Sequence, residues 1–245
     1  MEKIRISKYF TDCGVMSRRA AEEEIRLGRV SVNGRIAELG EKIDPEADEV
    51  VYRGRVIKPQ IDEKICVMLN KPRGIVCTAN DEKGRRNVTE LCRDVKGADG
   101  QKARLYPIGR LDMDSEGLLI LTNDGEVANK LMHPKHHVEK IYHVKVKGEI
   151  EPEVLTTLNG PMVIDDYKIK PVQVSIIERK EGNTILRFTL SEGRNRQIRK
   201  MCEQVNLKIT RLKRVAVGDL TIGMLKPGQW KYMNYNEISI LKGMS

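Results

Sequence analysis

The stretch Gly109-Arg110-Leu111-Asp112-Met113-Asp114-Ser115-Glu116-Gly117-Leu118-Leu119-Ile120-Leu121 joins a polar, acidic loop to a continuous apolar run. A short run such as Leu118–Leu121 is typical of a buried strand. Asp112 precedes this strand and lies two positions after Arg110. A carboxylate beside an arginine at the mouth of a strand is a candidate ionised nucleophile.

Asp112 also has two simpler interpretations. Taken without its context, it is more often a loop aspartate that caps a turn or pairs with Arg110. The acidic run matches the first half of a calcium-binding loop, which requires a glutamate at its twelfth position. The twelfth residue counted from Asp112 is Asn123, so the sequence disfavours calcium.

The composition indicates a soluble globular protein with a polyanionic partner. The 245 residues are 40% hydrophobic and 32% charged, with a net charge of +9. This charge favours nucleic acid over a membrane surface as the partner. The five cysteines are scattered without a C-x-x-C pair, so reduced thiols are expected rather than disulfides or a zinc site. No apolar run approaches the ~20 residues of a membrane span, and the first residues do not resemble a signal peptide, so we expect a cytoplasmic protein.

Residues 1–58 are predicted to form a small α/β domain. Apolar spacing predicts a helix over 4–13, and Ser17 is placed to cap a second helix that Gly28 ends. Alternation around Asn33-Gly34 predicts a hairpin, followed by a strand at 50–52. The first 35 residues carry eight basic and five acidic residues, so this part is basic. Residues 59–63 are predicted to be a linker.

Residues 64–245 are predicted to form an α+β domain with a mixed, mainly antiparallel sheet, because hairpins outnumber β-α-β units. The expected strands cover residues 65–69, 118–122, 138–146, 172–177, 186–190 and 207–217, and the expected helices cover 126–132 and 196–205.

Basic residues concentrate near the end of the chain. Residues 194–214 contain eight basic residues and one acidic residue. This segment is either a phosphate-facing surface or a source of cations for a carboxylate, and the simpler alternative is a solvated helix face. Tyr142 is in phase with an apolar strand face, so it is either a core residue or a stacking partner for a base. His133, His136 and His137 lack a fourth ligand at suitable spacing and are interpreted as a polar loop rather than a metal site.

Several motifs together resemble the RsuA/RluB-type ribosomal RNA pseudouridine synthases over essentially the whole chain. They are Lys71-Pro72-Arg73-Gly74, Pro107-Ile108-Gly109-Arg110-Leu111-Asp112, Gly117-Leu118-Leu119, Leu121-Thr122-Asn123-Asp124-Gly125, Glu139-Lys140 with Tyr142, and Glu192-Gly193-Arg194-Asn195-Arg196-Gln197-Ile198-Arg199. Residues 14–22 and 28–34 resemble an S4 RNA-binding domain.

The resemblance implies that uridine in ribosomal RNA is isomerised to pseudouridine without a metal or cofactor. It makes Asp112 the catalytic nucleophile, Tyr142 the tyrosine beside the target base and Arg199 the basic partner of Asp112. The expected substrate contacts are Arg110, Lys71, Arg73, Arg194, Arg196 and Lys200. The expected RNA contacts of the S4-like domain are Arg5, Lys8, Arg18, Arg19, Arg26, Arg29 and Asn33.

The segment 129–134 favours an RluB-type enzyme acting on 23S ribosomal RNA. RluF-type 23S and RsuA-type 16S enzymes are alternatives, and a non-catalytic S4-type ribosome assembly factor is an alternative of another class. The partner is expected to be ribosomal RNA or a ribosomal assembly intermediate, and the protein is expected to be a monomer that does not bind membranes.

Overall fold

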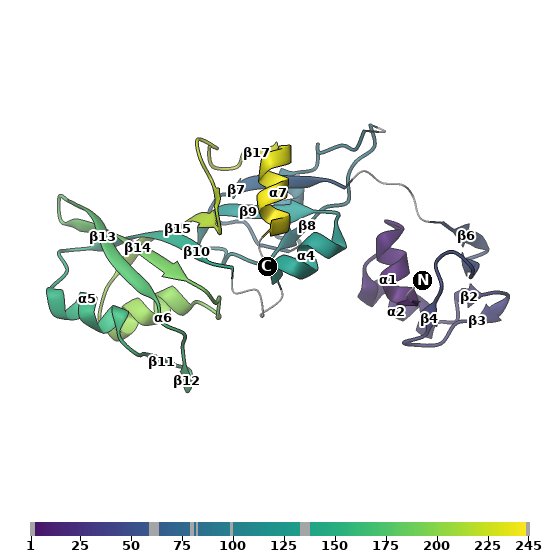
Figure 1. The fold of residues 1–245 in the computed structure, drawn as a ribbon, viewed down its shortest axis with the longest axis horizontal. Coiled ribbons are helices and arrows are strands. Elements are labelled where there is room, and N and C mark those ends of the chain that lie inside the picture. The colour runs from purple at the N-terminus through teal and green to yellow at the C-terminus, as the bar shows by residue number, and fades with distance from the viewer. Residues whose placement is uncertain are drawn as a thin grey trace. The chain divides into compact units, whose positions relative to one another are not determined.

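The computed structural model describes residues 3–58, 64–78, 81, 83–98, 100–132 and 138–243. The chain divides into two compact units, Met1–Glu63 and Lys64–Ser245 (Figure 1). The predicted linker, residues 59–63, lies outside the described residues. The histidines at 133, 136 and 137 also lie outside them.

The first unit contains two helices, a four-stranded sheet and a separate two-stranded sheet. Its elements are β1 (Ile4–Arg5), α1 (Ile6–Asp12), α2 (Arg18–Arg26), β2 (Val30–Val32), β3 (Arg35–Ile36), β4 (Lys42–Ile43), β5 (Val50–Tyr52) and β6 (Arg55–Ile57). The Ser17 side chain accepts a hydrogen bond from the amide of Ala20, which confirms the predicted helix cap. Asn33 and Gly34 have φ values of 50° and 80°, as a tight hairpin turn requires.

One boundary prediction in this unit is wrong. The helix expected from residue 4 begins at Ile6, because Ile4 and Arg5 pair with Ile43 and Lys42 as β1 and β4. Apolar spacing cannot distinguish a first helical turn from a two-residue strand that finds its partner nearly 40 positions later. Ile6, Tyr9 and Phe10 of α1 are buried in the core of this unit.

The second unit is an α+β domain with a mixed, mainly antiparallel sheet, as predicted. The structure gives this sheet nine strands. The main strand order is β13-β14-β10-β15-β9-β7-β17, with β16 and β8 paired to β15 and β9. The strands of this sheet are β7 (Cys66–Lys71), β8 (Tyr106–Ile108), β9 (Glu116–Thr122), β10 (Lys140–Lys147), β13 (Gln173–Lys180), β14 (Asn183–Leu190), β15 (Ile209–Val217), β16 (Leu220–Thr221) and β17 (Trp230–Tyr232). Its other elements are α3 (Val88–Leu91), α4 (Gly125–Met132), α5 (Pro152–Asn159), β11 (Val163–Ile164), β12 (Tyr167–Lys168), α6 (Gln197–Gln204) and α7 (Tyr235–Gly243). Within the described residues, no helix is long and apolar enough to cross a membrane.

Strand β9 is buried on both faces, which explains its uninterrupted apolar sequence. Leu118 and Ile120 belong to a core that includes residues of α4 and α7. Leu119 and Leu121 belong to a separate core on the other face, which includes Val88 of α3. A strand covered on both faces carries apolar residues at every position rather than at alternate ones.

The other half of the sheet is covered by helices on one face. Residues of β10, β13 and β14 pack against α5 and α6 in a third core (Figure 1). Val144, Leu186 and Phe188 point into this core and are fully buried. The alternate residue Arg187 is exposed. This alternation follows from the two-residue period of a strand.

A short parallel pairing joins the two halves. Arg214 of β15 lies beside Gly117 of β9, and Lys213 lies beside Glu116. Gly117 has a φ of 114°, and a Cβ atom there would lie 2.1 Å from the carbonyl oxygen of Arg214. Only glycine fits this junction, so the sequence Gly117-Leu118 fixes where the polar loop ends and the buried strand begins.

Candidate active site

A cleft of about 950 Å³ in the second unit brings most of the predicted site residues together. Its lining includes the loop that carries Arg110 and Asp112, Tyr142 of β10, and the start of α6 with Arg194, Arg196 and Arg199. The Asp112 side chain is 35% exposed, so it is accessible to a ligand in the cleft. The residues are far apart in sequence but converge on one open site.

Lys71 supports the Asp112 loop from below. Its ammonium donates hydrogen bonds to the backbone carbonyls of Pro72 at 3.1 Å, Asp112 at 3.0 Å and Ser115 at 2.9 Å. Lys71 is completely buried, and burial lowers the pKa of its ammonium to about 8. Gly74 adds a hydrogen bond from its amide to the carbonyl of Met113 at 2.7 Å. The loop is therefore held by its backbone, which leaves the Asp112 carboxylate free.

Lys71 is predicted from the sequence to contact RNA phosphate, and its environment in the structure corrects this prediction. All three N–H donors of the ammonium are used by carbonyls, and no part of the side chain is exposed. Lys71 therefore positions the loop rather than contacting substrate. Arg73, two positions later, is exposed, with one Nη1 contact of 3.4 Å to the carbonyl of Thr210.

Two arginines at the start of α6 face the acidic loop. Arg199 contacts Asp114, with Nη2 at 3.2 Å from the carboxylate and 3.1 Å from the carbonyl oxygen. Arg196 lies 3.3 Å from the Asp114 carboxylate and 3.9 Å from that of Asp112. The structure thus pairs Arg199 directly with Asp114, whereas the guanidinium nearest Asp112 belongs to Arg196.

Arg199 is also the more buried of the two. Its side chain is 18% exposed, against 45% for Arg196. Its Nε atom is buried and has no hydrogen-bond partner within the described residues. Burial lowers the pKa of Arg199, and the carboxylates of Asp114 and Asp112 oppose that shift. The catalytic role of Arg199 stays a prediction. Its direct ion-pair partner is Asp114.

Backbone geometry places these arginines at the cleft. Arg196 precedes α6 in the left-handed region, with φ 52° and ψ 29°, and has no side-chain cap. The amide of Arg194 donates to Oε1 of Gln197 at 3.1 Å, which closes the turn into the helix. Lys200 lies one residue beyond Arg199 and pairs with Asp165.

Tyr142 lies on the cleft side of β10, and two further basic residues surround it. Arg214 of β15 is opposite Tyr142, is only 4% exposed, and donates from Nε to the Leu118 carbonyl at 2.8 Å. Lys140 lines the same cleft, and burial lowers its pKa. Sequence reasoning included Arg214 only as part of a basic segment and did not select Lys140. Lys140 could have been found from the sequence, because it lies two positions before Tyr142 and therefore on the same face of the strand.

The basic segment 194–214 does not form one surface. Arg214 lies at the cleft. The neighbouring Lys213 is opposite His143 in the β10–β15 ladder, and its side chain is on the other face of the sheet. Arg211 is bound to Glu116 at 2.5 Å. Only the start of the segment, Arg194 to Lys200, forms a basic rim, because strand alternation divides the remainder between two faces.

The predicted RNA contacts of the first unit divide into paired and unpaired cations. Within the described residues, the exposed side chains of Arg5, Arg18 and Arg19 form no ion pair, whereas Lys8, Arg26 and Arg29 pair with Asp12, Glu23 and Glu24. The Asn33 amide donates to Asp48 at 2.8 Å and accepts from the amide of Glu49 at 2.9 Å. Asn33 therefore closes the hairpin in this structure, and a contact with RNA would compete with that role.

No cluster of three or more histidine, cysteine, aspartate or glutamate side chains within the described residues is arranged to hold a metal ion. The polar side chains that line the cleft include the carboxylates of Asp112 and Glu192, the Lys140 ammonium, the Tyr142 phenol and several arginines.

Comparisons with known proteins define the class of this fold and site. The chain belongs to the RNA pseudouridylate synthase family, whose sequence profile matches residues 65–204. It is 38% identical to ribosomal large subunit pseudouridine synthase B of Bacillus subtilis, over 98% of this chain and 96% of that protein. It is 37% identical to an uncharacterized RNA pseudouridine synthase of Aquifex aeolicus, over 98% and 94% of the two chains. A crystal structure of a pseudouridylate synthase matches with a TM-score of 0.67 and 28% identity, covering 97% of this chain and 99% of that one.

Proposed function

We propose that this pseudouridine synthase modifies a specific uridine of large-subunit (23S) ribosomal RNA, with Asp112 as its nucleophile. The observation that carries the proposal is a partly exposed Asp112 carboxylate on a loop held by Lys71, in a cleft that is also lined by Tyr142 and five arginines. Relatives named for the large subunit align with nearly the whole chain, which supports 23S as the substrate.

The chemistry requires the target uridine to leave its stack, because the glycosidic carbon is otherwise inaccessible. Asp112 then acts at the sugar, either by attacking C1′ or by removing the C2′ proton to give a glycal. The uracil leaves with the electrons of the glycosidic bond, turns and rejoins C1′ through C5, either displacing Asp112 or adding to the glycal as Asp112 returns the C2′ proton. The C5 proton then passes to solvent through Tyr142 or a water molecule beside it, and N1 of the uracil takes a proton from solvent. Arg196 and Arg199 place positive charge beside the acidic loop and orient its carboxylates.

Arg110, at the cleft edge, is proposed to fill the space left by the flipped base or to hold its phosphate. The exposed cations Arg73, Arg194 and Arg196 are proposed to contact the RNA backbone, which would make affinity depend strongly on salt. Lys200, which pairs with Asp165, would have to exchange that partner to join them.

The first unit is proposed to be an S4-like RNA-binding domain that contacts RNA through Arg5, Arg18 and Arg19, which are exposed and form no ion pair within the described residues. The protein is proposed to act in the cytoplasm, as a monomer, on ribosomal RNA or on an assembly intermediate.

The proposal is tested by tritium release from C5-labelled uridine in 23S transcripts. Replacing Asp112 by Asn keeps the side-chain shape but removes the nucleophile, so we expect release to fall by more than about 10³-fold while RNA binding persists. Normal turnover by Asp112→Asn would contradict the catalytic assignment.

Mapping pseudouridines in ribosomal RNA from cells with and without the protein identifies the target. Loss of one site in 23S RNA supports the RluB- or RluF-type assignment, and the position separates the two. Loss of a site in 16S RNA would instead show that the substrate is 16S RNA, as for an RsuA-type enzyme. Unchanged modification together with defective ribosome assembly would favour the non-catalytic assembly factor.

A further inference from the structure

The hairpin formed by β11 and β12 carries an aromatic residue to the rim of the cleft. Tyr167 lines the same cleft as Asp112 and is 37% exposed. Most large apolar side chains around the cleft, such as Leu190 and Leu212, are buried. An accessible aromatic ring at the entrance of an RNA-modifying site is unusual in a chain with only 4% aromatic residues.

The hairpin is held firmly at its base. Met162, Ile164 and Ile169 are buried in the core beneath α6, and the amide of Ile169 donates to the Met162 carbonyl at 3.0 Å. The two turn residues, Asp165 and Asp166, both have positive φ values, of 50° and 60°, which define a tight turn. Tyr167 therefore projects from a fixed support.

Helix α6 fixes the outer part of the same hairpin. Lys200 pairs with Asp165, and Gln204 donates from Nε2 to the Val163 carbonyl at 2.7 Å. The Arg194 guanidinium carbon lies 3.1 Å from the centroid of the Tyr167 ring. The guanidinium thus stacks on the ring, and this contact joins the hairpin to the segment that carries Arg196 and Arg199.

The Tyr167–Arg194 pair has the properties of a nucleobase platform. Aromatic rings and arginine guanidinium planes are the groups on which proteins stack unstacked RNA bases. Both residues are exposed at the cleft, so a second planar group has access to the pair. The cleft volume of about 950 Å³ lies at the upper end of the ~300–1,000 Å³ range of small-ligand pockets. A single flipped nucleoside does not fill it.

On the basis of the proposed function, we infer that Tyr167 and Arg194 form a second nucleobase subsite, which binds a base next to the flipped uridine by stacking. The ring and the guanidinium supply an apolar planar surface, and the charge of Arg194 favours the adjoining phosphate. The subsite selects RNA in which a nucleotide beside the target is also unstacked. A purine offers the larger stacking surface and is the preferred occupant.

The test is a double-mutant cycle between protein and RNA. The probe is a short 23S transcript containing the mapped uridine, with an abasic nucleotide introduced at each flanking position in turn. Tyr167→Ala should raise KM about tenfold on intact RNA, given the strength of base–aromatic stacking, and should leave kcat nearly unchanged. Tyr167→Phe should behave like the wild type, since stacking does not require the hydroxyl group.

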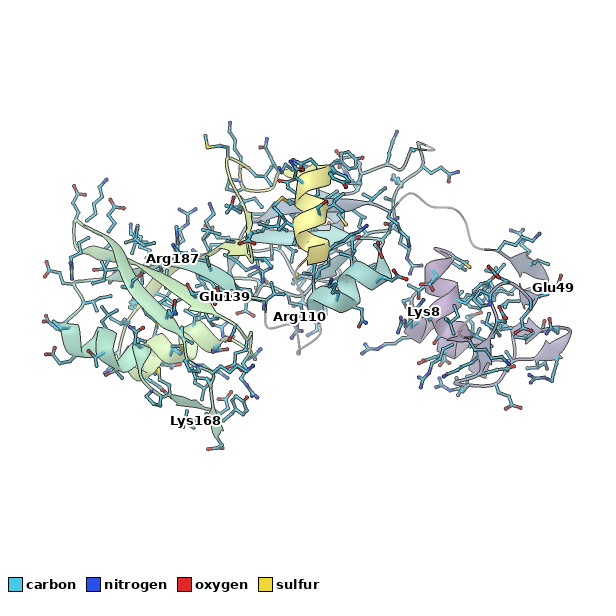
Figure 2. All side chains as sticks on the ribbon, in the orientation of Figure 1. Lys8, Glu49, Arg110, Glu139, Lys168 and Arg187 are labelled. Atoms are coloured by element: carbon cyan, nitrogen blue, oxygen red, sulfur yellow. The ribbon has the colours of Figure 1, made fainter. Side chains whose placement is uncertain are left out.

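Lys168→Ala is the matched control, because Lys168 lies next to Tyr167 on the same hairpin, is exposed and does not line the cleft (Figure 2). At one abasic position, the affinity of wild-type protein should fall by the same factor as the affinity of Tyr167→Ala for intact RNA. The same abasic position should not lower the affinity of Tyr167→Ala any further. Binding of the same RNAs to Asp112→Asn protein provides a readout that does not depend on turnover.

The inference is overturned if Tyr167→Ala has wild-type KM and affinity. It is also overturned if every abasic position lowers the affinity of Tyr167→Ala by the same factor as it lowers that of wild type. A Tyr167→Phe variant as weak as Tyr167→Ala, with unchanged thermal unfolding, also overturns it, because stacking is then not the interaction lost. Failure of the proposed function gives a different result. Wild-type protein then releases no tritium from 23S RNA, and the same binding cycle, carried out on the RNA in which mapping places the modified uridine, still reports on Tyr167.

Discussion

Two basic segments that contact the acidic loop have opposite environments. Lys71 in Lys71-Pro72-Arg73-Gly74 is buried and binds three backbone carbonyls. Arg194 and Arg196 in the second segment are exposed at the rim. The difference shows that the first segment fixes the position of the loop that carries Asp112, whereas the second presents positive charge to the ligand.

Removing the buried cation should give the largest effect. Lys71→Met leaves three carbonyls without a donor, so we expect a loss of about 3 kcal/mol in the free energy of unfolding. Because Asp112 loses its support, kcat should also fall about 100-fold. Urea unfolding and single-turnover tritium release measure the two effects.

Arg73→Met is the matched control from the same turn, since Arg73 is exposed. Its free energy of unfolding should stay within about 0.5 kcal/mol of wild type, as for most surface substitutions. If Arg73→Met destabilises the protein as much as Lys71→Met, the contrast between the two side chains is wrong.

The two arginines that face the acidic loop are expected to differ in their effects on kcat and KM. Arg199 is mostly buried and binds Asp114 through its carboxylate and its carbonyl, so Arg199→Gln should lower kcat by about 10²-fold, as the loss of an oriented charged group does. Arg196 is more exposed, so Arg196→Gln should mainly raise KM. Equal effects of both variants on kcat would show that Arg196, which lies 3.9 Å from Asp112, shares the supporting role.

The buried lysine also predicts a pH dependence. Burial lowers the pKa of Lys71 from 10.5 to about 8, and a neutral amine has only two N–H donors for its three carbonyl partners. The ratio kcat/KM should therefore fall as pH rises through 8, by up to about tenfold per pH unit.

The free energy of unfolding should rise with pH above 8, where kcat/KM is expected to fall. The unfolded chain keeps the Lys71 proton up to its ordinary pKa of 10.5, so between pH 8 and 10.5 the unfolded state binds more protons. The contribution of Lys71 to the free energy of unfolding therefore rises with pH in that window. A pH–rate profile of wild type that stays level through pH 8, or a descending limb that persists in Lys71→Met, would contradict this assignment.

The smallest effect concerns the first unit, where Arg18 and Arg19 are exposed and unpaired within the described residues. If both contact phosphate, changing both to Ala should reduce the slope of log affinity against log salt by about 2. The double change Lys8→Ala and Arg26→Ala is a control, because both cations already pair with carboxylates. An unchanged slope for Arg18 and Arg19 would mean that this face of the unit does not contact RNA.

Much of the fold was predictable because its signals are local. The Ser17 cap, the Asn33-Gly34 turn and the alternation of β13 and β14 each depend on neighbouring residues. Helix α5 was not predicted, because its short apolar stripe is clear only once it packs on β13. The β11–β12 hairpin was missed for a similar reason, since each strand has only two residues.

The sequence alone determined the class of enzyme, the α+β sheet and the candidate nucleophile Asp112, because motif order and strand periodicity are written along the chain. The tertiary structure decided which cations support the loop and which face the ligand. Lys71 and Arg73 differ by two positions, yet only one is buried, because β7 ends beneath the Asp112 loop. Burial and partner choice depend on residues distant in sequence, and therefore only the folded chain fixes them.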